Sequence, residues 1–385
     1  MSGEIVRIIP CTTPRLRHRF ERCAEVLNGH VGAFVPPFPG SVAKVLEPSS
    51  GFCSRHGEIF PFLAVRRGRT VGRIAAIVNR SHNSYHNDTV GFFGFFECED
   101  EPRTAHALFA EVSNLLGLKG FEVLRGPYNP SINDECGLLV SGFEYRPTIG
   151  LTWNPPHYDK LLRACGLAPV LKSHGFHLPL RKLDPPARLK PLAERVAKRT
   201  NARLRPIDLT RLGEEMEIVR DVYNSTLERN WGFVPVTSED FMAAAEEMKA
   251  IANPSLILIA EREGQVAGVA LALPDINEFL HATKRIPRFL RPLQLLLLLK
   301  AHRPRGCRQV VYGIVPSCRD RGLHGWMTYE HFVESRVRME WATLGWIQEN
   351  NTEVLETARL VGGEHRYTWS IFEKVLTPRG SPHRP

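Results

Sequence analysis

The chain has 385 residues, of which 43% are hydrophobic and 24% charged, so it can fold into two domains with apolar cores and is not a disordered protein. No apolar run reaches the roughly 18 to 20 residues of a spanning helix, and we expect a cytoplasmic protein without a signal peptide. The eight cysteines contain no CxxC pair, which indicates reduced thiols, and the net charge of +9 favours anionic partners.

The first half of the chain begins with a predicted strand at 7–10 and a helix at 14–27, followed by a hairpin at 61–78. The hairpin sequence LAVRRGRTVGRIAAI aligns without gaps on IAEREGQVAGVALAL, 196 residues later. Matches at the same shift occur near both ends of the chain. The sequence therefore predicts two copies of one domain of alternating strands and helices. We expect a first domain at 1–182, a linker at 183–198, a second domain at 199–377 and a disordered tail at 378–385.

Two insertions distinguish the copies. In the central part of each copy Gly94 best matches Gly313 and Gly126 best matches Gly345, a shift of 219. The second copy would then gain 23 residues at 277–308, and the first copy would gain 23 at 129–151. Because binding and catalytic residues are concentrated in such connecting segments, we look for function there.

The stretch from Gln309 to Trp326 reads as a buried strand, a basic turn and the start of a helix. Free N–H groups at a helix N-terminus, with arginines beside them, suit a pyrophosphate. An ordinary strand-to-helix turn is the alternative. The first copy has three carboxylates in the corresponding segment, 98–103, which would repel phosphates. Only the second copy is therefore expected to bind such a ligand.

This turn resembles the acyl-CoA-binding motif of the GNAT N-acyltransferase superfamily, Arg/Gln-x-x-Gly-x-Gly/Ala. Arg319, Gly322 and His324 occupy its three places, and His324 departs from the small residue of the motif. The resemblance implies an α+β fold of two tandem GNAT-like domains, each with a mixed central sheet flanked by helices, and acyl-CoA as co-substrate. It places acyl-CoA at Ile314, Val315, Ser317, Arg319, Asp320, Arg321, Gly322, Leu323, His324, Gly325, Asn350 and Asn351. A core strand before the turn, and a helix cap at Asn350 or Asn351, are the structural alternatives.

Three longer segments, GRIAAIVNRSHNSYHNDTVGFFGFFE, GPYNPSINDECGLL and RNWGFVP, resemble a family of two-domain GNAT-like proteins that includes bacterial ceramide synthases. The resemblance covers nearly the whole chain. It implies transfer of an acyl group from acyl-CoA to the amine of a sphingoid base, a long-chain amine. Acetyl transfer to a soluble amine and non-catalytic binding of acyl-CoA or lipid are the alternatives.

Acylation of an amine requires a base that accepts its proton. Relatives often place a carboxylate on the central strand and a tyrosine early in the last helix, but 310–317 contains no acid and 352–362 no tyrosine. The HNSYH segment lacks the glutamate of a metal-binding HExxH helix, and we expect no metal. The candidate bases are Glu349, Asp134, Glu135 and a pair of predicted loop histidines, His82 and His86.

Residues 285–305 contain five consecutive leucines between basic ends. This apolar run is too short to span a bilayer. It fits a helix lying on an anionic membrane, with a helix packed over the sheet as the alternative. Aromatic residues do not alternate with the charges, so we expect no nucleic-acid partner.

Overall fold

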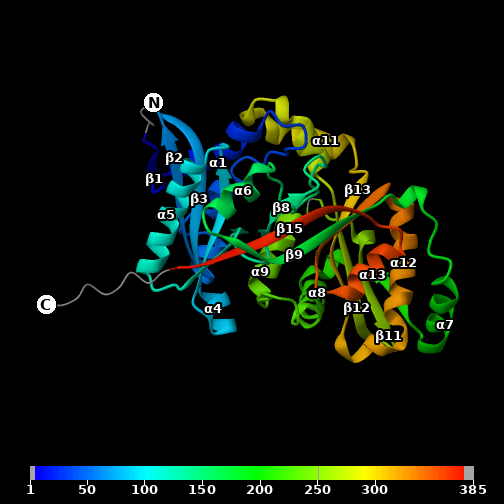
Figure 1. Ribbon diagram of the computed structural model, residues 1–385. Coiled ribbons are helices and arrows are strands. Elements are labelled where there is room, and N and C mark those ends of the chain that lie inside the picture. The colour runs from blue at the N-terminus through cyan, green and yellow to red at the C-terminus, as the bar shows by residue number, and fades with distance from the viewer. Residues whose placement is uncertain (1–4, 250, 377–385) are drawn as a thin grey trace. The chain divides into compact units, whose positions relative to one another are not determined.

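A computed structural model describes residues 5–249 and 251–376 (Figure 1). The contacts within the chain divide it into two compact units. The first unit contains the described residues up to 172 together with 279–301 and those from 367 onward; the second contains 173–278 and 302–366. The predicted tail, 378–385, lies outside the described residues.

The first unit is built on a mixed sheet in which one pair of neighbours, β4 and β5, is parallel. Its strands lie in the order β1 (Arg7–Pro10), β2 (Gly57–Arg66), β3 (Arg69–Asn79), β4 (Val90–Cys98), β5 (Val123–Gly126) and the end of β15 (Glu364–Val375). β8 (Leu138–Ser141) also pairs with β15, and β6 (Tyr128–Asn129) pairs with β7 (Glu135–Cys136). The helices are α1 (Pro14–Asn28), α2 (Ser41–Val45), α3 (Gly51–Arg55), α4 (Arg80–His86), α5 (Pro102–Leu118), α6 (His157–Ala164) and α11 (Arg291–Ala301).

The second unit repeats this arrangement, with β13 and β14 as the parallel pair. Its strands lie in the order β10 (Arg203–Pro206), β11 (Ile257–Arg262), β12 (Gln265–Pro274), β13 (Gly306–Ile314), β14 (Trp341–Gln348) and the end of β9 (Ala168–Leu178). Its helices include α7 (Lys190–Thr200), α8 (Leu212–Leu227), α9 (Ser238–Met248), α12 (Leu323–Arg338) and α13 (Thr352–Leu360). α7 begins within the predicted linker, 183–198, extends two residues beyond it, and packs against α12. α10 (Asn277–Ala282) stands at the boundary between the units.

Strand pairing confirms the internal repeat. Arg7 lies opposite Val65, and Arg203 lies opposite Glu261, so both partners are shifted by 196. A register shift follows Ala64 in the first hairpin and Ala260, its counterpart, in the second. The copies therefore share their pairing pattern as well as their sequence.

The shift of 219 expected for the central strand is wrong. Ile77 pairs with Phe92 and its counterpart Leu273 pairs with Arg308, which gives a shift of 216. The two glycines that suggested 219 meet different neighbours. A Cβ on Gly94 would lie 1.6 Å from the carbonyl oxygen of Tyr128, whereas a Cβ on Gly313 would lie 2.6 Å from the side chain of Thr226.

Each unit takes the last strand of its sheet from the other repeat. In the first unit β15 pairs with β5, where Phe372 lies opposite Gly126. In the second unit β9 pairs with β14, where Leu178 lies opposite Ala342. Phe372 and Phe176, on these exchanged strands, are almost completely buried. Neither sheet is therefore completed by its own repeat.

Candidate functional site

The basic turn of the second repeat has the predicted order of strand, turn and helix. β13 ends at Ile314, a short 3-10 helix spans Pro316–Arg321, and Gly322 leads into α12 with a φ of +74°. Among the side chains that the structure describes, none caps the start of α12 with a hydrogen bond, so none of these competes with an anion for its first N–H groups. The exposed Arg319 donates from Nε to the Ile314 carbonyl oxygen at 3.3 Å, and Ser317 is also exposed. The side chains of Asp320 and Arg321 lie outside the described part of the structure.

Both glycines of the turn pack against α7. A Cβ on Gly322 would lie 3.1 Å from Val196, and one on Gly325 would lie 2.8 Å from Leu192. Gly322 favours glycine because of its positive φ, while at Gly325 an added Cβ would only have to displace the end of the Leu192 side chain. The glycines of the motif thus have a packing role whatever binds at the helix end.

β13 and β14 are paired only along their first halves. Their pairing runs from Gly306 opposite Trp341 to Gln309 opposite Leu344 and stops there. Beyond Gln309, β13 continues alongside β12 to Ile314. The gap between the parted strands opens into a cavity.

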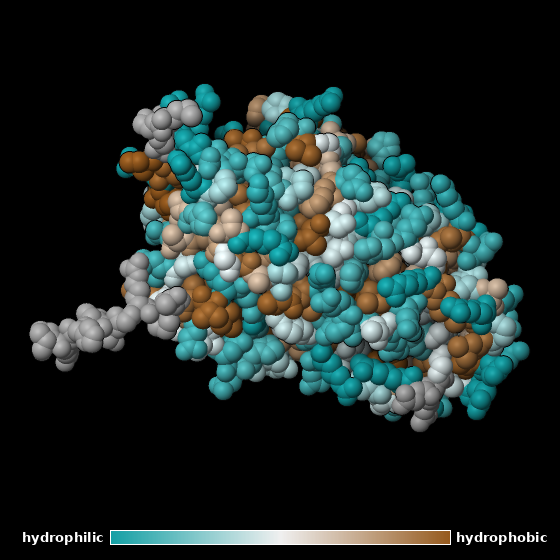
Figure 2. All heavy atoms as spheres, in the orientation of Figure 1, coloured by the Kyte–Doolittle hydropathy of each residue, from teal (hydrophilic) through white to brown (hydrophobic). Residues whose placement is uncertain are grey.

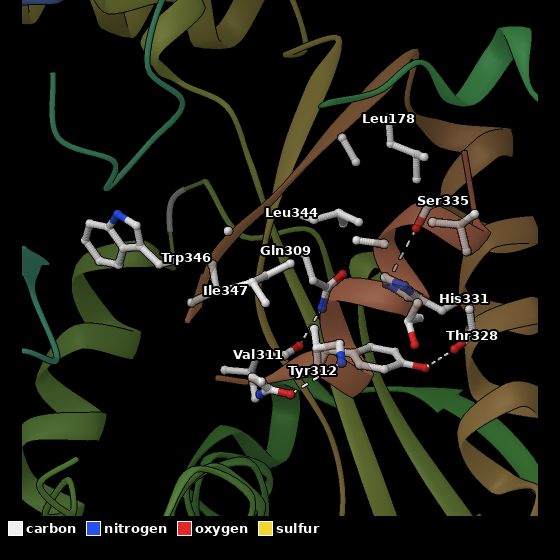
Figure 3. A pocket seen from close by; sticks show the side chains of 18 of the residues that line it. Leu178, Gln309, Val311, Tyr312, Thr328, His331, Ser335, Leu344, Trp346 and Ile347 are labelled. Carbon is white, nitrogen blue, oxygen red and sulfur yellow. Dashed lines mark hydrogen bonds between the residues drawn. The ribbon is translucent and has the colours of Figure 1, made fainter. Parts of the chain in front are cut away.

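This cavity has a volume of about 150 Å³ and lies among β13, β14, α12 and α13 (Figure 3). Figure 3 shows His331, Ser335 and Leu178 on one side of it and Trp346 on the opposite side. Its apolar lining includes Leu178, Leu180, Val311, Phe332, Ala342, Leu344, Ile347, Val354, Ala358 and Val361. Its polar lining includes Asn230, Gln309, Tyr312, Thr328, His331, Ser335, Gln348 and Asn351.

A row of polar side chains forms the α12 wall of the cavity. The hydroxyl groups of Tyr312 and Thr328 lie 2.5 Å apart, and burial raises the pKa of Tyr312. His331 Nε2 lies 3.5 Å from Ser335 Oγ. Protein surrounds the His331 ring, and this burial lowers its pKa to about 4, so it is neutral at pH 7. The sequence analysis missed His331; the helical spacing of Thr328, His331 and Ser335 was the available signal.

Gln348, the last residue of β14, also lines the cavity. Gln348 accepts a hydrogen bond from Trp231 N and donates one to Trp231 O, both at 2.9 Å. This pair fixes the RNWGFVP segment beside the cavity. Asn351 accepts a hydrogen bond from Val354 N at 3.3 Å, which confirms its role as a helix cap, while Asn350 is exposed. Burial lowers the pKa of His324, whose carbonyl oxygen accepts from Thr328 Oγ1 at 2.8 Å.

In the first repeat, side chains occupy the positions that correspond to the start of α12 and to the cavity of the second repeat. The Glu101 carboxylate caps the start of α5 by accepting from Arg103 N at 3.1 Å, and Glu99 forms an ion pair with Arg66. Next to β4, Asn129 Oδ1 accepts from Phe95 N at 2.6 Å. Carboxylates and an asparagine of the first repeat thus stand at the places that correspond to the start of α12 and the cavity of the second repeat.

The structure distributes the five candidate bases over both units. Glu349 belongs to the second unit, is exposed just beyond β14, and is not among the residues lining the cavity. Asp134 and Glu135 are exposed in the first unit, where Asp134 accepts from Ser131 Oγ at 2.6 Å.

The two candidate histidines lie in the helix α4, so the expectation of a loop is wrong: Asn79 caps this helix by accepting from His82 N at 2.9 Å. His82 is buried, with Nε2 3.4 Å from Asp88 Oδ2 and 3.2 Å from Arg125 Nη1. Burial lowers its pKa to about 4. The ring of His86 lies 4.4 Å from that of His82. These contacts give His82 a structural role within the first unit.

No group of three or more His, Cys, Asp or Glu side chains in the described ranges is placed to hold a metal ion. Within the same ranges, every helix falls short of the length and apolarity that crossing a bilayer requires.

Comparison with known proteins gives relatives over almost the full length, although no family model matches the chain. The chain is 28% identical over 378 residues to a protein of Caulobacter vibrioides named bacterial ceramide synthase, covering 96% of this chain and 97% of that protein. It is 27% identical over 324 residues to protein YghO of Escherichia coli, covering 82% of each.

Solved structures share the fold. A tandem GNAT protein from the clavulanic acid biosynthesis pathway superposes with a TM-score of 0.57 at 11% identity, covering 97% of this chain and 99% of that one. A GCN5-related N-acetyltransferase from Sphaerobacter thermophilus superposes with a TM-score of 0.52 at 12% identity, covering 96% of each. The chain therefore has the tandem GNAT fold, which confirms the predicted α+β class. In sequence it is similar over nearly its whole length to a bacterial ceramide synthase, and these relatives support an acyltransferase.

Proposed function

We propose that the chain is an acyl-CoA-dependent N-acyltransferase that acylates the amine of a sphingoid base. The observation that carries this proposal is the contrast between the repeats. The second has a cavity between parted strands, close to an uncapped helix end with Arg319, whereas side chains of the first fill the corresponding places. The acceptor is proposed from the similarity to the Caulobacter protein.

In the proposed complex the pyrophosphate lies at the first N–H groups of α12, near Arg319, and the pantetheine arm follows β13 towards Gln309. The amine lone pair attacks the thioester carbonyl carbon, the C–S bond breaks, and CoA leaves as a thiolate. The amine loses one proton in forming the amide. Of the candidate bases we propose Glu349 as its acceptor, because it directly follows Gln348, which lines the cavity. Glu349 lies five residues beyond Leu344, the partner of Gln309, so we propose that the proton reaches it through water.

We also infer that α11 brings the protein to the surface of an anionic membrane. Two arginines face inward, Arg288 just before the helix and Arg291 at its start. Arg288 pairs with the fully buried Glu21, and Arg291 Nη1 lies 3.1 Å from Glu25 Oε2. Burial alone would raise the pKa of Glu25, but the hydrogen bonds and charges of the two arginines hold it below its usual value. These arginines are therefore not available to lipid phosphates, contrary to the sequence interpretation.

With its arginines inside, the helix region turns an apolar face outward. Phe289, Leu290, Leu293, Leu296 and Leu297 are all exposed. In Figure 2, hydrophobic side chains reach the surface among hydrophilic ones near the position of α11 in Figure 1. Arg285 and Lys300, both exposed, flank this face and complement an anionic surface.

The test of the proposed function is CoA thiol release, with the mass of the product, for pairs of acyl-CoA and amine. We expect release from long-chain acyl-CoA only when a sphingoid base is present, and a product with the mass of the amide. Release only from acetyl-CoA with a polar amine would instead support a soluble-amine acetyltransferase. Binding of acyl-CoA without release under any pairing would contradict catalysis.

A further inference from the structure

Helix α7 and the residues just before it form a basic surface. From 188 to 199 the chain has five basic side chains and one acidic side chain, Glu194. All five basic side chains are exposed, and we call them the α7 surface: Arg188, Lys190, Arg195, Lys198 and Arg199. Among the described carboxylates none forms an ion pair with these five, whereas the neighbouring Arg203 is paired with Glu261. The chain therefore leaves most of this charge without a counter-charge.

The outward side of α7 is polar as well as basic. Arg195, Lys198 and Arg199 are spaced i, i+3 and i+4, so they lie on one face of the helix, while Ala193 and Val196 are buried. α7, which is described throughout, exposes no large hydrophobic side chain. A helix that binds a membrane surface needs such side chains to enter the acyl region. The α7 surface is therefore better suited to an acidic protein than to a bilayer.

The same helix borders the basic turn. The side chains of Val196 and Leu192 are the nearest neighbours of a Cβ added to Gly322 and to Gly325. In Figure 1, α7 lies on the outer side of α12, the helix that begins at this turn. A protein that docks on α7 would thus stand beside the position proposed for the pyrophosphate.

We propose that the α7 surface docks a small acidic carrier protein that holds the acyl group as a thioester on a phosphopantetheine arm. The proposal rests on the proposed function and adds a second acyl donor to it. The arm has the same thiol end as CoA, and its phosphate would lie at the start of α12. The amine attacks the thioester carbonyl carbon, the C–S bond breaks, and the thiolate stays on the arm. The proton that the amine loses balances the one that this thiolate takes up.

Exposed charges of this kind act mainly on the rate of encounter. Complementary charged surfaces raise association rates by about 10 to 10³ at low salt, and the gain falls as salt is added. CoA is itself anionic and also responds to the charge of α7. The informative quantity is therefore the ratio of kcat/KM for the carrier-bound donor to kcat/KM for acyl-CoA.

The first experiment measures this ratio with a palmitoyl-loaded bacterial acyl carrier protein, palmitoyl-CoA and a sphingoid base. Combining Arg195→Glu, Lys198→Glu and Arg199→Glu should lower the ratio about tenfold or more, and salt should lower it in wild type. The matched control reverses three exposed cations of the first unit and should leave the ratio unchanged: Arg15→Glu, Arg22→Glu and Lys160→Glu. An equal fall with both triple variants, or no fall with either, would overturn docking on α7.

A second measurement separates the α7 surface from the catalytic site. The apo carrier protein has no phosphopantetheine arm, so its binding depends on the protein surfaces alone. Its dissociation constant should rise about tenfold or more in the α7 variant and remain unchanged in the control.

Two outcomes distinguish the docking surface from the proposed function. Turnover of palmitoyl-CoA with no binding of the carrier protein would overturn the docking and leave the proposed function intact. Turnover with neither donor would contradict the proposed function, while apo carrier protein that still binds wild type and not the α7 variant would support the docking. If the α7 variant loses binding to anionic vesicles and the carrier protein does not bind, the surface contacts a membrane and the proposal is wrong.

Discussion

The outward face of α11 makes the membrane proposal quantitative. Leu293, Leu296 and Leu297 are 58%, 49% and 58% exposed. Full burial of a leucine side chain contributes about 2 kcal/mol, so transferring their exposed parts into the acyl region contributes about 3 kcal/mol. Replacing all three by serine should weaken partitioning onto vesicles by about a hundredfold, since about 1.4 kcal/mol corresponds to a factor of ten.

The assay is sedimentation with vesicles of anionic or neutral lipid, at low and high salt. Wild type should bind anionic vesicles, and salt should weaken this binding without abolishing it, because Arg285 and Lys300 contribute about 1 kcal/mol each near an anionic surface. The matched control is Leu118→Ser with Val337→Ser, at positions 73% and 75% exposed but outside α11. Equal binding by wild type, triple variant and control, or binding by none, would refute the reasoning.

Replacing the inward-facing arginines of the same segment should change the stability of the protein. Arg288→Ser with Arg291→Ser leaves Glu21, whose side chain is fully buried, without its cation. Loss of one partner of a buried ion pair destabilises by about 3–5 kcal/mol. This variant should therefore lower the thermal unfolding temperature, whereas the leucine variant should not. A stable arginine variant that only loses vesicle binding would show that the ion pairs do not hold the segment.

Three further predictions concern the second unit. Arg319→Glu should weaken CoA binding by about a hundredfold or more, because a carboxylate replaces a cation beside the pyrophosphate, while Arg103→Glu in the first unit should leave the dissociation constant unchanged; equal losses would contradict a single site. Glu349→Gln should lower kcat by about 10² with unchanged acyl-CoA affinity, and an unchanged kcat would move the proton acceptor elsewhere. Because the pKa of His331 is about 4 in the folded state and near 6.5 when unfolded, the unfolded chain binds the proton first as the pH falls. Wild type should thus lose up to about 3 kcal/mol more unfolding free energy between pH 6.5 and pH 4 than His331→Gln, as measured by urea unfolding, and parallel profiles would contradict the burial of a neutral imidazole.

The sequence predicted those features that are set by local pattern. The hairpin at 61–78, in whose turn Arg67 and Gly68 both have positive φ, and the strand, turn and helix around Gly322 follow from turn residues and apolar spacing. The repeat was visible because strand pairing preserves one shift of 196. By contrast, matching Gly94 with Gly313 gave the wrong register for the central strand. Each of these glycines lies against a different neighbouring residue, so the two positions are not equivalent.

Other features depend on partners distant in the sequence. The pattern of 285–305 shows arginines next to leucines but not which of them face inward, which is decided by Glu21 and Glu25, more than 260 residues earlier. The sequence also did not predict that β9 and β15 each pair with a strand of the other repeat. The sequence of a strand indicates that it is a strand but not which sheet it joins. His331 went unnoticed because a single histidine on a helix has no motif; its position opposite Tyr312 gives it a place in the cavity.

The two insertions differ in what they place beside the central strand of each repeat. In the first repeat, the segment that begins the insertion places Asn129 on the backbone of β4, in the gap beside that strand, and Glu101 caps the neighbouring helix. In the second repeat, the insertion leaves before β13, and its residues 279–301 fold with the first unit. None of residues 279–301 lines the cavity beside β13, whereas Cys307, near the end of the insertion, does. Shortening the first insertion should therefore expose polar backbone rather than create a second binding site, because the carboxylates at the start of α5 would still exclude a pyrophosphate.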